Sequence, residues 1–160
     1  MNMVAIRTAL AVVALAGCAS APMISRGTVD QHPVYHVFND GIAAFNSKDL
    51  DVFMQQWDDD IQMYTADVGW LRGKGLVRER FSQTFQRFPR VHMEIDSLRV
   101  TPLAPTVANV DFIFRTYPNG AGPAFHGVGT GTYVLRGKRW VEVLEHESIV
   151  SVDEALRRPR

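Results

Sequence analysis

The sequence has little of several features that would each indicate a class of protein. It contains one cysteine, Cys18, in 160 residues, so the chain cannot form an internal disulfide and packing has to stabilise it. Lysine plus arginine and aspartate plus glutamate number 17 each, a balance that disfavours nucleic acid or a broadly acidic partner. The N-terminal apolar run, Ala9–Ala16, is well short of the roughly 20 residues that a transmembrane helix needs. We find no internal repeat and no low-complexity segment.

The surroundings of Cys18 are typical of a lipid attachment site. The thiol follows Leu15-Ala16-Gly17, and only Arg7 carries a charge before it. This pattern resembles a bacterial lipobox, in which the cysteine is lipidated and becomes the first residue of the mature chain. An ordinary secretory cleavage would place Pro22 directly after the cut, which signal peptidases handle badly. We therefore predict attachment to a membrane through Cys18 and a location in the bacterial cell envelope, at the outer membrane facing the periplasm.

The rest of the chain is long enough for one domain and too short for two. We predict a lipoprotein signal peptide over residues 1–17, the lipidated cysteine and a tether over 18–31, a folded domain over 32–151 and a polar tail over 152–160. Apolar residues at helical spacing predict a helix from Pro33 and a second helix over residues 50–57, ended by Asp58-Asp59-Asp60. A third helix is predicted over residues 76–88, because Pro89 stops it.

After Pro89 the apolar period changes from 3.6 to 2. It predicts strands over residues 91–100, 107–117, 125–135 and 140–150, in addition to a short strand over 61–65 that is followed by a loop over 66–75. Short connections between consecutive strands favour an antiparallel meander. The sequence therefore predicts an α+β fold with helices covering one face of the sheet.

Two groups of motifs resemble one superfamily. Asn46-Ser47-Lys48-Asp49-Leu50-Asp51, with Gly73-Lys74-Gly75 before an aromatic helix, is similar to the opening half of the nuclear transport factor 2-like (NTF2-like) superfamily. The stretch over residues 129–135, followed by Trp140 and Glu145-His146-Glu147-Ser148, resembles the final hairpin of its SnoaL-like and DUF4440-type members. The resemblance implies a cone-shaped barrel, with three N-terminal helices packed on a curved antiparallel sheet around a pocket. It also implies a homodimer, because many members pair through the outer face of the sheet.

Alternation along the last strand selects candidate catalytic residues. Trp140, Glu142, His146 and Ser148 share one face, and the resemblance places that face inward. His146 is then a candidate general acid or base, since histidine titrates near neutrality, or else a structural histidine. Glu142 would be paired, protonated or functional inside the cone, unless a bulge at residues 143–144 turns it to solvent. Asp111 would face solvent or assist, about 10 Å from His146 if the strands pair in order.

Aromatic residues are the other candidates for a site. They are plausible walls of a pocket for a small molecule or, alternatively, simply core: Trp57, Tyr64, Trp70, Phe81, Tyr133 and Trp140. We predict no cofactor and no metal. Three functions stay open: binding of a small, largely apolar molecule in the cone; a dehydratase, cyclase or isomerase using His146; and a dimeric interaction module whose cone is filled by its own side chains.

Overall fold

The computed structural model describes residues 32–157. The predicted signal peptide, the lipidated Cys18 and the tether lie outside the described residues. Among the described helices, none is long and apolar enough to cross a membrane.

Local sequence signals explain where the helices begin and end. Pro33 occupies the first turn of α1, and the His32 ring accepts a hydrogen bond from the Val34 amide. Lys48 ends α1 in the left-handed conformation, with φ 63°, and Asp49 caps α2 through the Val52 amide. The helices are α1 (Pro33–Ser47), α2 (Leu50–Phe53), the 3-10 helix η2 (Met54–Gln56), α3 (Lys74–Arg87) and the 3-10 helix η3 (Glu154–Leu156).

Six strands form one sheet in the order β2-β1-β6-β5-β4-β3. The pair β1 and β6 is parallel, and every other neighbouring pair is antiparallel. The predicted antiparallel meander over the last four strands is confirmed. The strands are β1 (Trp57–Thr65), β2 (Gly69–Arg72), β3 (His92–Ala104), β4 (Val107–Tyr117), β5 (Phe125–Arg136) and β6 (Arg139–Val152).

Two sequence-based predictions near β1 are wrong. The second helix ends at Gln56 and not at Trp57, and Asp58-Asp59-Asp60 lies inside β1. The acidic run is compatible with a strand because bases lie beside it: Arg136 pairs with Asp58 at 3.1 Å and Lys74 with Asp59 at 3.6 Å. The predicted loop over residues 66–75 contains β2, and all four residues of β2 pair with β1.

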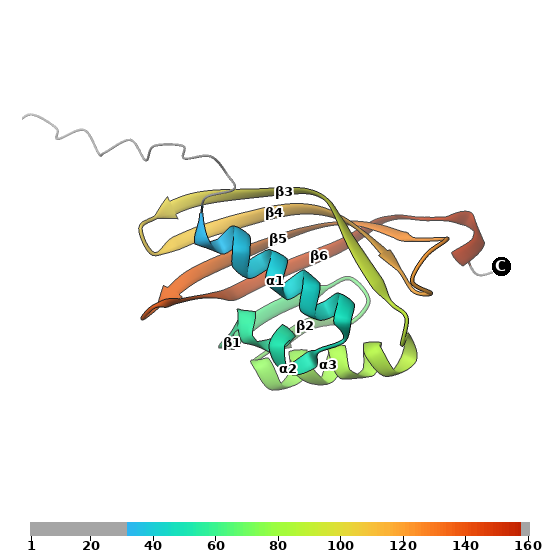
Figure 1. The fold of residues 1–160 in the computed structure, drawn as a ribbon, viewed down its shortest axis with the longest axis horizontal. Coiled ribbons are helices and arrows are strands. Elements are labelled where there is room, and N and C mark those ends of the chain that lie inside the picture. The colour runs from blue at the N-terminus through green and yellow to red at the C-terminus, as the bar shows by residue number, and fades with distance from the viewer. Residues whose placement is uncertain (1–31, 158–160) are drawn as a thin grey trace, which may run out of the picture.

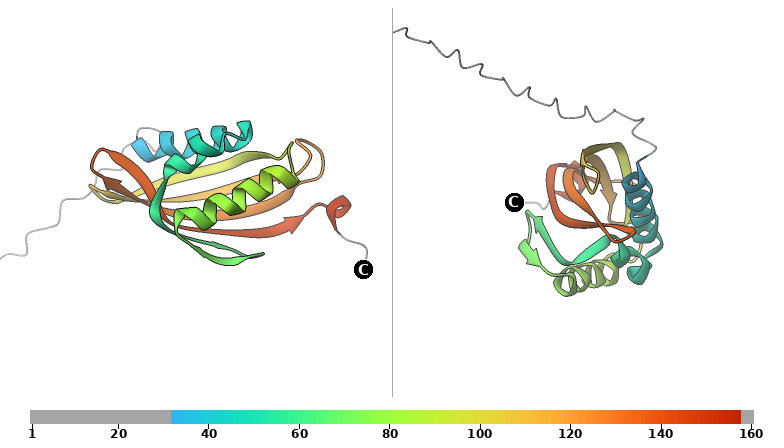
Figure 2. Two further views of the ribbon diagram at one scale, coloured as in Figure 1. Left: turned by 90° about the horizontal axis from the view of Figure 1, so that it is seen from below. Right: turned by 90° about the vertical axis from the view of Figure 1, so that its left-hand side faces the viewer.

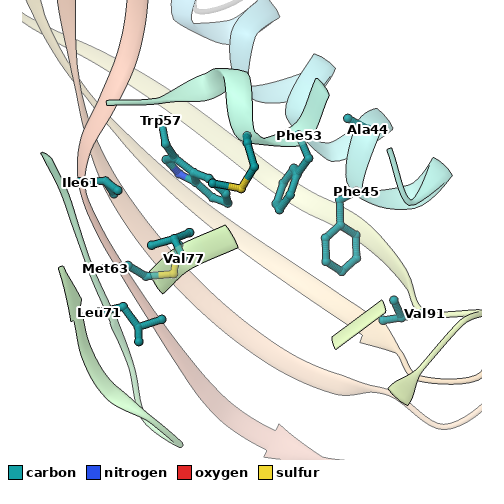
Figure 3. Close-up of a cluster of buried hydrophobic side chains, with 10 residues drawn as sticks. Ala44, Phe45, Phe53, Trp57, Ile61, Met63, Leu71, Val77 and Val91 are labelled. Carbon is teal, nitrogen blue, oxygen red and sulfur yellow. The ribbon is translucent and has the colours of Figure 1, made fainter. Parts of the chain in front are cut away.

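The sheet is curved and unclosed, and the helices lie on its concave side (Figures 1 and 2). Helix α1 packs against β3 and β6, whereas α3 packs against β1 and β2. This arrangement confirms the predicted cone-shaped α+β fold, with the three helices ahead of the long strands in sequence. Figure 3 shows one part of the core, where side chains from α1, α2, β1, β2 and α3 converge.

Glycines on β5 leave room for aromatic rings inside the cone. A Cβ atom on Gly127 would lie 2.2 Å from the Phe114 ring, and one on Gly129 would lie 2.1 Å from the Phe112 ring. Both rings are almost fully buried, so glycine at these positions lets them lie directly against the β5 backbone. The repeated glycines of β5 therefore belong to the inner face of the sheet.

Candidate functional site

A bulge in β6 decides which side chains face the inside of the cone. Thr132 pairs with Leu144 but the next residue, Tyr133, pairs with Glu142, so Val143 is an extra residue in the strand. An extra residue reverses the alternation of faces beyond it. Glu142 therefore lies inside before the bulge, and Glu145 lies inside after it.

The bulge corrects the prediction for His146. We predicted one inward face containing Glu142 and His146, and this is right for Glu142 but wrong for His146, which is exposed. The predicted alternative, a bulge that turns Glu142 to solvent, is also wrong, because Glu142 is 3 % exposed. The bulge exists, but it turns the residues that follow it.

A large cavity occupies the wider part of the cone. This cone cavity has a volume of about 640 Å³ and lies between α3, the end of β1 and the inner face of β3 to β6. Threonines and Gln83 supply neutral polar groups, and Asp67 and Arg80 form an ion pair of 2.5 Å in its wall. Most of the remaining lining is apolar: Phe45, Met63, Phe81, Phe88, Val91, Met93, Phe114, Pro118, Phe125, Ile149 and Val152.

A second, much smaller cavity lies deeper in the molecule. This inner chamber has a volume of about 30 Å³, and Phe45, Phe81, Met93 and Glu147 line both it and the cone cavity. Its other walls carry two further carboxyls and several rings: Glu142, Glu145, Phe38, Phe53, Trp57, Phe112, Ile42 and Gln56. Among the described residues, Glu147 is thus the one charged residue that lines both cavities.

The deep carboxyls have few hydrogen-bond partners. The Trp57 indole donates to Glu142 Oε2 at 3.0 Å, but Glu142 Oε1 and Glu145 Oε2 have no partner among the described residues. The buried Tyr133 hydroxyl also makes no bond of normal hydrogen-bond geometry with a described residue, but it lies close enough to Glu142 to favour the charged carboxylate and so to lower its pKa, against the larger effect of burial. Gly131 makes room for this carboxyl, because a Cβ atom there would lie 1.8 Å from Glu142 Oε1. Unsatisfied buried carboxyl oxygens are costly, so they need protonation or a ligand.

Burial sets the protonation of the three glutamates. Loss of hydration raises the pKa of Glu142 to about 8 and that of Glu147 to about 7. The pKa of Glu145 lies well above its ordinary value, first because the carboxyl is buried and then because Glu142 and Glu147 carry charge nearby. Arg80 acts against the shift at Glu147 by favouring its charged form. At neutral pH, Glu142 is therefore mostly protonated, and Glu147 lies near the midpoint of its titration.

Several predicted site residues lie on the opposite, outer face of the sheet. Tyr64, Trp70 and His146 line an outer pocket of about 350 Å³, and the Tyr64 ring lies 5.4 Å from each of the other two rings. Asp111 also faces outward and binds Arg99 at 2.8 Å, which confirms the solvent-facing alternative. Asp111 lies two strands from His146, as predicted, and Thr130 is in register with both on the strand between them.

The other predicted aromatic residues lie inside the fold but have different surroundings. Trp57 and Phe81 stack at 5.3 Å and line the inner chamber. Tyr133 is fully buried, and Trp140 packs on the α1 side of the core with its ring 5.1 Å from His32. The sequence reasoning missed Glu145 and Glu147 because it assigned them to the outer face. Three glutamates within six residues of one strand, at positions 142, 145 and 147, were the available signal.

Comparison with known proteins places the chain in a family. The SnoaL-like domain model matches residues 34–152, whereas no curated protein matches the chain. An NTF2-like protein of unknown function from Pseudomonas putida superposes with a TM-score of 0.68 at 17% identity, covering 79% of this chain and 90% of the other. A proposed scytalone dehydratase from Novosphingobium aromaticivorans gives 0.68 at 11% identity, with coverages of 79% and 87%. A proposed NTF2-like dehydratase from Streptomyces avermitilis gives 0.64 at 14% identity, with coverages of 74% and 94%. This chain is therefore a member of the SnoaL-like domain family, with the NTF2-like fold.

Proposed function

We propose that this protein binds a small, largely apolar molecule in the cone cavity. The observation that carries the proposal is the volume of about 640 Å³ behind walls made mainly of apolar side chains, among which phenylalanine is the most frequent. Small-molecule sites have this size and composition, with a few polar groups that fix the orientation of the ligand. A cavity of this volume also argues against the third function considered from the sequence, in which the cone is filled by its own side chains.

A matched pair of threonine substitutions tests the proposal. Thr116 lines the cone cavity on β4, whereas Thr130 lines the outer pocket on β5. Thr116→Phe fills part of the cavity, so it should raise the Kd of the neutral fluorescent probe N-phenyl-1-naphthylamine by about tenfold or more. A tenfold change corresponds to about 1.4 kcal/mol of binding free energy. Thr130→Phe should bind the probe as the natural chain does. Equal binding by both variants, or a loss only in Thr130→Phe, would contradict the proposal.

A second candidate function is an acid–base enzyme of the dehydratase, cyclase or isomerase type. The observation that favours it is the Glu147 carboxyl, which lines the cone cavity and has a pKa of about 7. A carboxyl poised near the working pH can give and take a proton efficiently. Two structural neighbours are described as proposed dehydratases. In this function Glu147 takes the role that the sequence assigned to His146, which lies on the other face of the sheet.

A substrate screen with one variant tests this candidate. Glu147→Gln should abolish turnover of any substrate found while leaving the melting temperature close to that of the natural chain, because the role is proton transfer. His146→Ala should retain turnover. Loss of turnover in His146→Ala alone would move the chemistry to the outer pocket.

We also propose that the protein is held in the bacterial cell envelope by a lipid on Cys18. The support is the lipobox-like sequence ahead of the thiol. Cys18→Ser should release the protein from membranes or block its processing. Mass analysis that finds an unlipidated chain beginning at residue 22 would contradict this proposal.

We propose, finally, that two copies pair through the outer face of the sheet. This face exposes apolar side chains on three neighbouring strands, at Ile113, Val128 and Leu144. A glutamate in the middle of such a face disfavours pairing because it would be buried without a partner. Val128→Glu should therefore sediment as a monomer in analytical ultracentrifugation, under conditions where the natural chain sediments as a dimer. A monomeric natural chain would refute the pairing.

A further inference from the structure

The inner chamber combines an excess of acidic groups with aromatic walls. Glu142, Glu145 and Glu147 all line it, and no lysine or arginine is among the described residues that do so. The three carboxyls do not form a metal-binding group, since none is found in residues 32–157. The described wall of the chamber therefore offers no basic side chain to an ionised carboxyl.

The deepest carboxyl oxygens point to a missing hydrogen-bond donor. Glu142 is 3 % exposed and Glu145 is 7 % exposed, and each has one oxygen without a partner, as noted above. The Trp57 indole is already used on the second oxygen of Glu142. An N–H donor that enters the chamber beside Glu145 would give its Oε2 the partner that it lacks.

The rings around these carboxyls fit a cation as well. Phe53 lies 4.6 Å from Trp57 and 4.8 Å from Phe81, and all three rings line the chamber. Aromatic faces attract ammonium groups, most strongly where water is excluded. The volume of about 30 Å³ exceeds the roughly 10–15 Å³ that one buried water molecule needs on the same measure, so the chamber has room for a primary ammonium group. A trimethylated ammonium has no N–H group to donate there.

We propose that the cone binds a primary amine, with the ammonium group in the inner chamber against Glu145 and Glu147 and the apolar body in the cone cavity. This inference rests on the proposed binding function and names the class of its ligand. Glu147 lines both cavities, so a molecule that extends past this side chain would occupy both. The larger volume accepts the hydrocarbon part, and the smaller one accepts only its charged end.

Binding of such an amine is linked to the proton on Glu147. Alkylamines stay protonated near neutral pH, as lysine does, so the carboxyl has to lose its proton to form the ion pair. The charged and titratable groups around it are Glu142 and Glu145 on its own strand, Tyr133 on β5, Arg80 and Arg87 on α3, and Asp67. Affinity should therefore rise as the pH passes upward through about 7, and binding should release a proton.

Four ligands with one tail separate the head-group preference from apolar binding. The full chain is titrated by calorimetry with n-octylamine, n-octanol, octanoate and octyltrimethylammonium at pH 8. The Kd of octylamine should be lower than that of octanol by a factor of about ten or more. A factor of ten corresponds to about 1.4 kcal/mol of binding free energy, which is at the low end for a hydrogen bond to a charged group. Octanoate and octyltrimethylammonium should bind more weakly than octanol.

Variants of single glutamates locate the preference. Glu147→Gln and Glu145→Gln should each reduce octylamine affinity to near the octanol affinity of the same variant. Glu79→Gln, the same substitution at an exposed position of α3, should retain the full preference. Two glutamine variants are used so that loss of folding in one leaves the other as a test.

Octylamine that binds no better than octanol, or a preference that survives both variants, overturns the amine inference while the apolar binding function stands. Failure of all four ligands to bind contradicts both.

Discussion

The buried Glu142 carboxyl makes the stability of the protein depend on pH. Its pKa is about 8 in the folded chain against 4.5 for an ordinary glutamate, chiefly because burial removes hydration. The folded state thus holds the proton more tightly than the unfolded state, so its contribution to stability is complete below about pH 4.5 and is lost as the pH rises toward 8. At about 1.36 kcal/mol for each pH unit between the two values, the loss reaches about 5 kcal/mol. That is a large share of the ~5–15 kcal/mol that stabilises a typical domain.

Glu142→Gln removes this titration while keeping a side chain of similar shape that still accepts from the Trp57 indole. Urea unfolding followed by tryptophan fluorescence, from pH 4 to pH 9, gives the free energy of unfolding at each pH. The two proteins should agree within about 1 kcal/mol at pH 4, as near-isosteric side chains do. The variant should lose less stability toward pH 9, by up to about 5 kcal/mol. Glu79→Gln, on the surface, should follow the natural chain. Parallel curves for Glu142→Gln and the natural chain would refute the assignment of Glu142 as a buried, protonated acid.

Three further substitutions test the packing around the site. Gly131→Ala should destabilise the domain by about 1–3 kcal/mol, the usual cost of overpacking, because its Cβ would collide with Glu142; Gly75→Ala, where the added atom meets open space, should cost nothing in the same chemical denaturation. Trp57→Phe should lower the free energy of unfolding by about 1–3 kcal/mol, because it removes the donor to a buried carboxyl; retention of full stability would mean that the bond is not formed. His146→Ala should change the free energy of unfolding by less than about 0.5 kcal/mol, as substitutions of exposed residues usually do. A larger loss would mean that the ring is buried.

The sequence was sufficient for the order and type of most elements. The alternation after Pro89 predicts β4 over residues 107–117, which is also its observed range. The helix predicted from Pro33 is α1. Errors occurred where tertiary contacts decide the local structure. Asp58-Asp59-Asp60 has a polar pattern typical of a helix end or turn, but residues on either side of it, Trp57 and Gln62, pair with β6, and two basic neighbours lie beside it.

The candidate site was harder to predict than the fold because it depends on one inserted residue. Strict alternation places Glu142 and His146 together, and the bulge at Val143 separates them. Nothing in the local sequence of β6 marks that bulge, since Val143 and its neighbours are ordinary strand residues. The glycines of β5 carry a weak indication of the inner face, because Gly127, Gly129 and Gly131 each lie under a bulky inward side chain.

The central claim, that ligands occupy the cone cavity, is tested most directly by NMR of the methionine methyl groups. Met63 and Met93 line the cone cavity, whereas Met54 is buried outside it. With ¹³C-labelled methionine methyls, adding n-octanol should shift the signals of Met63 and Met93 and leave that of Met54 unchanged. If saturating ligand shifts neither the Met63 nor the Met93 signal, and changes are confined to the Trp70 indole of the outer pocket, the ligand does not bind in the cone cavity.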